Sequence, residues 1–367
     1  RRRRRRNARA LRLHNAMLDD RLTVHQLPQM AGFDESRLTV VVAFDFGYQI
    51  HDKACWRWLE KWLLLDPSSI NLTLLHIETV RDPAKLELTS YRYISLEDSS
   101  RFLPYDVWRS LRRNKYPHHE VVLLQTNIGI SKSILDYMRY DAPRHAMLVL
   151  GSRHHTPSII PRFLMGSVSS DVTAKIDSHP VLLIRTRLFK DVSDLREDTV
   201  GSAYLGLREE GKEFGCGRSI CIAVDGAHVK SLVHYVMREI MRKTDIVQIV
   251  HCAADENAST LARVSAELEE IREELKTFLD DENQLDSVLL DFTGDIREKV
   301  LEHVDERMSS KAIDLLVIGN RTRRAVLSRN IIGSTAQYIL QYAHVPVLMV
   351  PDALIEYMED DAMSTAA

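Results

Sequence analysis

Two glycine–serine pairs are the residues of this chain best suited to bind an anion. Gly166-Ser167 and Gly333-Ser334 each precede a stretch of helical length. The free N–H groups in the first turn of a helix favour phosphate or carboxylate. Glycine has no side chain, so it lets the backbone approach such a group closely. The chemistry expected of these pairs is therefore phosphate binding by backbone groups.

Two aspartates stand where strand-like segments end and helical patterns begin. Asp45 closes one apolar run and Asp225 closes another. The carboxylate of Asp225 either contacts a bound ligand or caps the helix predicted at 228–243, and both interpretations stay open. For Asp45 the cap is favoured, because the bulky Phe46 follows it.

No set of residues suited to covalent catalysis is apparent. No neighbouring histidine is suited to activate Ser167 or Ser334, and neither a P-loop G-x4-G-K-[S/T] nor a G-x-S-x-G elbow occurs. The chain is therefore predicted not to be an enzyme, with slow nucleotide hydrolysis as the alternative.

Histidines and cysteines are not arranged as a metal site. Adjacent histidines rarely converge on one ion, and no further ligands complete the pairs His118-His119 and His154-His155, so solvated loop histidines are expected. The cysteines, which form no C-x-x-C pair, are Cys55, Cys216, Cys221 and Cys252. Cys221 and Cys252 fall in apolar runs, and buried free thiols suit a reducing compartment.

The positions of these residues repeat along the chain. Four landmarks occur twice in the same order: an apolar run ending on Asp, an apolar run ending on Gly and then Arg, a Gly-Ser pair, and a last apolar run opening with Pro. The apolar runs are 38–45, 147–153 and 180–185 in the first copy, and 218–225, 315–321 and 346–350 in the second. We therefore predict two copies of one domain.

Further apolar runs alternate with helical patterns. Strands are predicted at 71–77, 119–125, 245–252 and 286–291, and a long helix at 257–283. This alternation predicts an α/β fold of two tandem open parallel five-stranded sheets with helices on both faces. Residues 80–104 are polar and have no clear counterpart, so an irregular excursion is expected there.

Composition and charge set the boundaries around the two copies. We predict a basic N-terminal tail at 1–37, a first domain at 38–187, a linker at 188–217, a second domain at 218–352 and an acidic C-terminal tail at 353–367. The net charge of −3 indicates no general attraction to nucleic acid or membrane. No apolar stretch reaches the ~20 residues of a membrane-spanning helix.

The order of strand, glycine loop, Gly-Ser pair, helix and Pro-led strand is similar to the universal stress protein family. The resemblance covers residues 38–187 and 218–352. It implies a nucleotide site between the first and fourth strands of each domain, where an Asp contacts the adenosine and a loop G-x2-G-x9-G-[S/T] holds the phosphates. The ligand would be ATP or another adenine nucleotide, with Mg²⁺ only together with ATP.

Both copies depart from the loop of that family. His154 and Thr322 occupy the place of its middle glycine, where a Cβ atom would crowd the phosphates. The loop 151–166 is two residues longer than the family motif, and the loop 319–333 is one longer. The second copy departs less and adds arginines that can neutralise phosphates, so any nucleotide is expected there.

The candidate site residues follow from this comparison. In the second domain they are Asp225, Gly226, Gly294, Gly319, Arg321, Gly333, Ser334 and Thr335. In the first domain a weaker set comprises Asp45, Gly151, Gly166 and Ser167.

Two features point to partners other than a nucleotide. Residues 1–6 are all arginine. This run predicts either a solvated tail or a basic segment that binds an acidic partner such as RNA. Trp58 and Trp62 share one face of the first helix and are expected in the core. Trp56 points elsewhere, either into the core or toward a partner.

Two functions of different classes remain. The first is a tandem universal stress protein of the cytoplasm, a non-enzymatic nucleotide-binding or nucleotide-responsive module in a stress response. The second is a structural subunit of a large assembly, cytoskeletal or ciliary for example, with vestigial nucleotide sites. In either case the two domains are expected to pair within one chain through their last strands, 180–185 and 346–350, because each is an apolar sheet edge.

Overall fold

A computed structural model describes most of the chain. The described residues are 37–44, 49–80, 90–113, 115–143, 145–153, 167–186, 217–224, 229–252, 258–290, 295–308, 313–320 and 333–354. Nearly all of both predicted tails and of the predicted linker lies outside these ranges.

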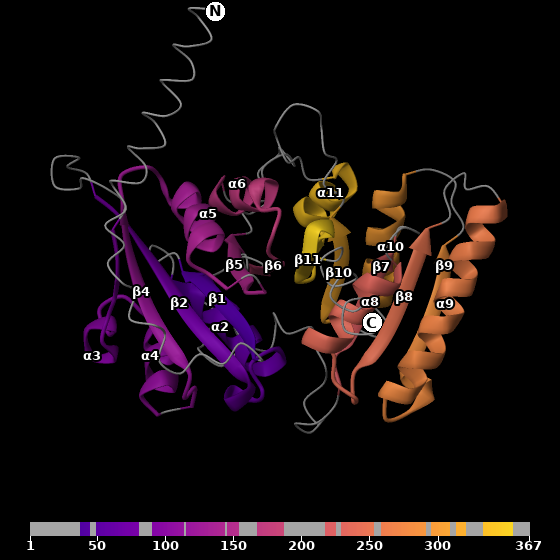
Figure 1. Ribbon diagram of the computed structural model, residues 1–367, viewed down its shortest axis with the longest axis horizontal. Coiled ribbons are helices and arrows are strands. Elements are labelled where there is room, and N and C mark those ends of the chain that lie inside the picture. The colour runs from indigo at the N-terminus through magenta and orange to yellow at the C-terminus, as the bar shows by residue number, and fades with distance from the viewer. Residues whose placement is uncertain are drawn as a thin grey trace, which may run out of the picture. The chain divides into compact units, whose positions relative to one another are not determined.

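The described strands form one 11-stranded sheet in the order β3-β4-β2-β1-β5-β6-β11-β10-β7-β8-β9 (Figure 1). They are β1 (Leu38–Phe44), β2 (Ile70–Thr79), β3 (Ser90–Tyr93), β4 (His119–Thr126), β5 (Met147–Arg153), β6 (Val181–Thr186), β7 (Ser219–Val224), β8 (Ile246–Cys252), β9 (Leu285–Leu290), β10 (Leu315–Asn320) and β11 (Val347–Pro351). The strands predicted at 71–77, 119–125, 245–252 and 286–291 are β2, β4, β8 and β9, each within two residues at either end.

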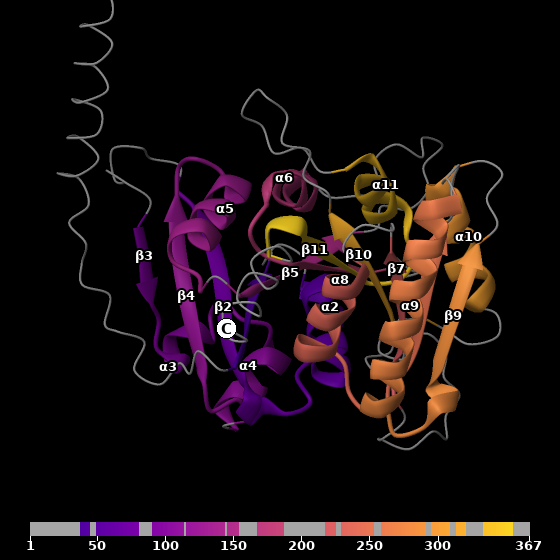
Figure 2. The same cartoon turned by 45° about the vertical axis from the view of Figure 1, so that its right-hand side comes forward.

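Helices cover both faces of the sheet, as the apolar strands require. They are α2 (Gln49–Trp62), α3 (Leu96–Ser99), α4 (Tyr105–Arg112), α5 (Ile130–Tyr140), α6 (Ser167–Lys175), α8 (Val229–Glu239), α9 (Ala258–Phe278), α10 (Ile296–Met308) and α11 (Ser334–Tyr342). Val40 and Val42 join a buried cluster with α2, α4, α8 and α9, whereas Val41 joins a second cluster with α5, α6, α10 and α11. Figure 2 shows α8 and α9 side by side on their face. The α/β class predicted from the alternating runs is confirmed.

The first copy carries regular structure where an irregular excursion was expected. Between β2 and β4 the described residues form β3, α3 and α4, and residues 81–89 lie outside the description. β3 pairs antiparallel with β4 and adds a sixth strand to this copy. Its short length and polar sequence hid it from a search for long apolar runs.

The last strands of the two copies run side by side. β6 pairs antiparallel with β11, with Val347 opposite Leu183 and Leu348 opposite Leu182. These side chains are at most 2% exposed. Both buried clusters contain residues from the two copies. This pairing joins the strands of the two copies into one continuous 11-stranded sheet, so the structure differs from the two predicted five-stranded sheets in this detail, within the same α/β class.

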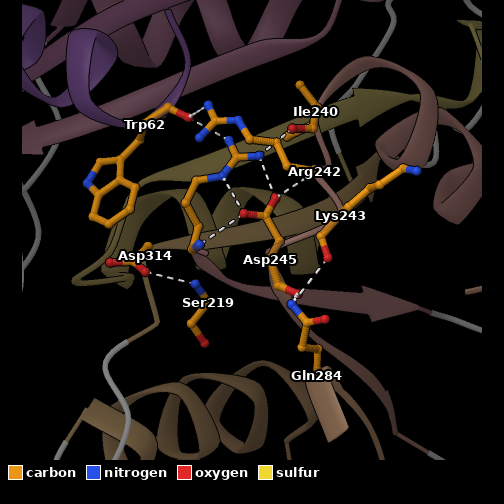
Figure 3. A network of polar contacts seen from close by, with 9 residues as sticks. Trp62, Ser219, Ile240, Arg242, Lys243, Asp245, Gln284 and Asp314 are labelled. Atoms are coloured by element: carbon orange, nitrogen blue, oxygen red, sulfur yellow. Dashed lines mark hydrogen bonds and ion pairs between the residues drawn. The ribbon is translucent and has the colours of Figure 1, made fainter. Parts of the chain in front are cut away.

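A buried ion pair of the second copy also reaches the first copy, through a hydrogen bond of its arginine (Figure 3). The Arg218 guanidinium and the Asp245 carboxylate are both 0% exposed and approach to 2.6 Å. Asp245 Oδ1 also accepts the Arg218 backbone N–H at 2.9 Å. Arg218 Nη1 donates to the carbonyl oxygen of Trp62, at the end of α2, at 2.7 Å. Each charge of the pair is thus hydrogen-bonded as well as neutralised, as burial demands.

A second arginine shares the same acceptors. Arg242 Nη2 donates to the Trp62 carbonyl oxygen at 2.6 Å, and its backbone N–H donates to Asp245 Oδ2 at 2.9 Å. Burial, together with the positive charge of Arg218, lowers the pKa of Arg242 to about 10. Two cations at the carbonyl end of α2 also complement the negative end of that helix dipole.

All three tryptophans of α2 are buried. Trp56 is 0% exposed, and its ring makes an edge contact with Tyr116 at 5.5 Å between centroids. Trp58 is 2% and Trp62 is 6% exposed. The interpretation of Trp56 as a partner surface is therefore wrong. Trp56 does not share the face of Trp58 and Trp62, but α4 packs near α2 and Tyr116 contacts the Trp56 ring, so this side of α2 is covered as well.

Candidate functional site

The carboxyl ends of β7 and β10 lie side by side. The two strands are parallel, with Ala223 opposite Ile318. Val224 and Gly319 follow these residues directly. Ligands of open α/β sheets bind at such an edge, where the order of the strands reverses. Asp225 follows Val224 in the sequence, so its carboxylate is expected at this end of the sheet.

The first turn of α11 begins beside this edge without a capping side chain. Gly333 is the residue before the helix, has φ −60° and ψ 143°, and offers no side chain to cap it. Ser334 and Thr335 are exposed, whereas Ala336 is 4% exposed and packs into the core. Backbone N–H groups of an uncapped first turn bind anions well. The predicted phosphate-binding residues Gly333, Ser334 and Thr335 are thus placed together.

Asn320 holds the start of this helix to the end of β10. Its Oδ1 accepts the backbone N–H of Gly333 at 3.1 Å, and its side chain is 1% exposed. The contact fixes the two ends of the segment 321–332 relative to each other. Sequence analysis missed Asn320, although a polar residue at the end of an apolar strand was the available signal.

The described protein atoms leave room for a Cβ atom at both strand-end glycines, Gly319 and Gly151. A Cβ on Gly319 would meet Leu232 Cδ2 at 3.8 Å, and one on Gly151 would meet Cys55 Cβ at 3.8 Å. Both are ordinary contact distances. Among the described neighbours, packing therefore gives no reason for glycine at either position.

Gly319→Ala is therefore expected to fold almost as well as the wild-type chain, with a change in unfolding free energy within about 0.5 kcal/mol. If a phosphate approaches Gly319, the same change should weaken nucleotide binding. Urea denaturation and calorimetry would measure the two effects. Gly217→Ala is a contrasting variant, because its Cβ would lie 1.4 Å from the Thr244 carbonyl oxygen. A large loss of stability in Gly319→Ala would show that the glycine is needed for packing.

A charged and aromatic group links the start of α10 to α11. Asp295 precedes α10, and its carboxylate accepts hydrogen bonds from the backbone and the side chain of Arg297. These bonds lower the pKa of Asp295. The Arg297 guanidinium stacks over the Tyr338 ring at 4.9 Å. Tyr338 is one turn after Ser334 on α11, so this group borders the candidate site.

The corresponding place in the first copy is built differently. α6 begins at Ser167, and Ser169 Oγ donates to the carbonyl oxygen of Gly151 at 3.3 Å. A side-chain hydroxyl thus ties the helix to the strand end where the second copy uses Asn320. Of the weaker set, Gly151 and Ser167 lie in the described structure, and Asp45 and Gly166 do not.

Several predicted residues of the second site also lie outside the described residues. They are Asp225, Gly226, Gly294 and Arg321. The alternative roles of Asp225, ligand contact or helix cap, therefore remain predictions.

Each copy places a buried histidine beside the end of its first strand. His76 lies opposite Phe44 in β2 and β1, and His251 lies opposite Val224 in β8 and β7. They are 8% and 1% exposed. The ring Nδ1 of His251 lies 3.2 Å from the Val224 carbonyl oxygen. Sequence analysis missed this pair, although both histidines follow an apolar run in the same place of the repeat.

The other histidine and cysteine predictions have separate outcomes. His119 lies in β4, not in a loop, and its Nδ1 is 2.6 Å from the Tyr116 carbonyl oxygen. Among the described residues Cys221 is buried and forms no disulfide, as predicted, and Cys55 is buried as well. The described residues contain no cluster of three or more His, Cys, Asp or Glu arranged to hold a metal ion. Within the same residues, none of the helices has the length and apolar composition needed to cross a membrane.

Part of the sequence matches a known protein family. Residues 218–351 match the family model of the universal stress protein family. No curated protein matches the chain.

Two solved structures are similar over most of the chain. A functionally unknown protein from Pseudomonas aeruginosa PAO1 is 15% identical with a TM-score of 0.51, over 90% of this chain and 98% of that chain. A protein assigned to the universal stress proteins from Pseudomonas aeruginosa UCBPP-PA14 is 15% identical with a TM-score of 0.52, over the same shares of the two chains. At this identity the likeness shows the fold alone. The family match therefore identifies residues 218–351 as a domain of the universal stress protein family.

Proposed function

We propose that the second domain binds an adenine nucleotide, with its phosphates at the first turn of α11. The chain would act as a nucleotide-responsive binding module of the cytoplasm and not as an enzyme. The observation that carries the proposal is the exposed, uncapped start of α11, which Asn320 holds beside the carboxyl end of β10. Membership of residues 218–351 in the universal stress protein family supports adenosine as the nucleoside.

The geometry favours a phosphate over a neutral group at this place. The free N–H groups of the first turn and the positive end of the helix dipole both attract negative charge. Ser334 and Thr335 add exposed hydroxyl groups that can donate to phosphate oxygens. Mg²⁺ would bind only together with ATP, coordinated by the phosphate oxygens.

Gly333→Val is expected to weaken ATP binding at least tenfold, about 1.4 kcal/mol, by placing a branched side chain where phosphate must approach. The backbone of Gly333 has φ −60° and ψ 143°, which valine adopts freely. Folding should therefore be nearly unaffected. Isothermal titration calorimetry of the full chain with ATP, ADP and AMP would measure binding, and urea denaturation would measure stability.

Matched variants in the first copy serve as controls. Asp45→Ala and Gly166→Val should leave ATP affinity unchanged, whereas Asp225→Ala should reduce it. The proposal would be overturned if Gly333→Val and Asp225→Ala both bound ATP like the wild-type protein. Loss of binding in the first-copy variants alone would place the nucleotide in the first domain and would contradict the proposal.

Ser334→Asp is expected to separate binding from folding by changing them in opposite directions. A carboxylate in the first turn stabilises the helix by about 0.3–1 kcal/mol through its dipole. The same charge repels phosphate, so ATP affinity should fall while the unfolding midpoint stays level or rises. Ser167→Asp, at the start of α6, should show the gain in stability without the loss of affinity. Thermal unfolding with and without ATP would show both.

A further inference from the structure

The outward face of α4 is a basic and aromatic surface. Its exposed or half-buried side chains, together with one arginine before the helix and one directly after it, make up what we call the α4 patch: Arg101, Tyr105, Trp108, Arg109, Arg112 and Arg113. Val107 and Leu111 form the opposite, buried face. The spacing i, i+4 puts Tyr105 above Arg109 on the same side of the helix.

The cations of this patch are largely without counter-ions. Among the described residues, Arg101, Arg109 and Arg113 make no ion pair. Two carboxylates near the patch already serve other groups. Glu60 accepts from Lys115 at 2.9 Å, and Asp106 lies 4.0 Å from Arg57. The patch is therefore a local excess of positive charge in a chain whose net charge is −3.

The aromatic rings of the patch are held in place and accessible. Tyr105 is 63% exposed, and its ring centroid lies 6.2 Å from that of Trp108. Trp108 Nε1 donates to the Leu96 carbonyl oxygen at 3.0 Å, which fixes the indole. The Arg112 guanidinium stacks over that indole at 5.0 Å. An exposed ring beside a stacked arginine offers a platform for another flat ring.

We propose that the α4 patch binds single-stranded nucleic acid. Unpaired arginines would contact successive phosphates, and Tyr105 would stack on a base. An acidic peptide would use the charges but would leave the rings without a partner of matching shape. The exposed carboxylates of α3, Glu97 and Asp98, border the patch, so the strand would lie on the side of α4 away from α3.

A second copy of this chain is a poorer occupant. Its most acidic helix is α9, which carries five glutamates. Each of them already has a basic neighbour within 4 Å; the pairs are Arg263–Glu267, Arg272–Glu269, Lys230–Glu270, Lys276–Glu273 and Lys230–Glu274. Docking α9 on the patch would break as many ion pairs as it formed.

The patch also lies in the part of the first copy that the second copy lacks. The segment from β2 to β4 contains β3, α3 and α4, whereas β8 and β9 are joined through the single long helix α9. The added segment thus brings a surface that neither nucleotide site requires.

Arg109→Ser with Arg113→Ser is expected to reduce the salt dependence of binding to a fluorescein-labelled 12-nucleotide oligouridylate. Each lost phosphate contact lowers the slope of log K against log salt by about 0.7 for a single strand, so two changes should lower it by about 1.4. Fluorescence anisotropy of the full chain at several salt concentrations would measure this. The arginines at 1–6 are the same in both proteins, so their contribution cancels. Arg272→Ser with Lys276→Ser removes the same charge from α9 and should leave the slope unchanged.

Tyr105→Ala is expected to weaken the same complex about 5- to 150-fold without changing the salt slope, as for one lost stacking contact. Trp108 supplies a local probe, because it is half-buried while the other three tryptophans are buried. Bound oligouridylate should quench its fluorescence, and Trp108→Phe should remove that quenching. The proposal would be overturned by equal affinity in all variants, which would assign binding to the arginine-rich segment. It would also be overturned if poly-glutamate competed as well as the oligonucleotide and Tyr105→Ala left the affinity unchanged. That result would indicate an acidic protein as the partner of the patch.

Discussion

Replacing Asp245 with alanine is expected to lower the free energy of unfolding by about 3–5 kcal/mol, the usual cost of leaving one charge of a buried pair without its partner. The Arg218 guanidinium is 0% exposed and would lose its carboxylate with no access to water. The backbone N–H groups of Arg218 and Arg242 would lose their acceptors as well. Urea denaturation followed by circular dichroism would measure the change.

Two further variants test the reason for that loss. Arg218→Met combined with Asp245→Asn removes both charges and leaves an amide oxygen to accept a backbone N–H group, so it should destabilise less than Asp245→Ala alone. Glu302→Ala breaks an exposed pair with Lys299 and should cost at most about 1 kcal/mol. If Asp245→Ala cost no more than Glu302→Ala, the buried pair would not make the contribution to stability that its burial and hydrogen bonds indicate.

The strands of this fold could be predicted because each is a short apolar run. Parallel strands buried on both faces need such runs, and Val40, Val41 and Val42 are all 0% exposed. The repeat of landmarks then gave the order of the elements in both copies. β3 escaped because an edge strand of four residues needs no apolar pattern.

The role of single residues was harder to predict, because it depends on contacts distant in sequence. Arg218 opens an apolar run and reads as a surface charge, yet its partners are 22, 27 and 156 residues away. Trp56 could be assigned to the core only once Tyr116 was known to cover it. Trp108 gave no signal of its own, because its exposure depends on where α4 lies.

The candidate nucleotide site was predictable in position but not in detail. The Gly-Ser pair and the strand-end glycine mark a phosphate loop in sequence, and the structure places Gly319 and Gly333 at the two ends of that loop. The hydrogen bond from Gly333 to Asn320 spans 13 residues of sequence, and nothing in the motif predicts it. Local motifs therefore indicate where an anion binds, whereas the groups that hold the site in shape come from the folded sheet.

Leu182→Lys and Val347→Lys are each expected to destabilise the chain by several kcal/mol, because each would bury an unpaired ammonium group at the junction of β6 and β11. Leu182 is 2% and Val347 is 0% exposed, and both lie in strands that pair across the two copies. If the copies form a pair within one chain, the wild-type protein should elute with the mass of a single chain. The lysine variants should then open the junction, unfold at lower urea concentration and aggregate through the freed strand edges. Size-exclusion chromatography with light scattering would measure the mass, and Thr79→Lys, on an exposed strand end, is the matched control. A wild-type dimer that Leu182→Lys converts into a monomer would show instead that the last strands pair between two chains.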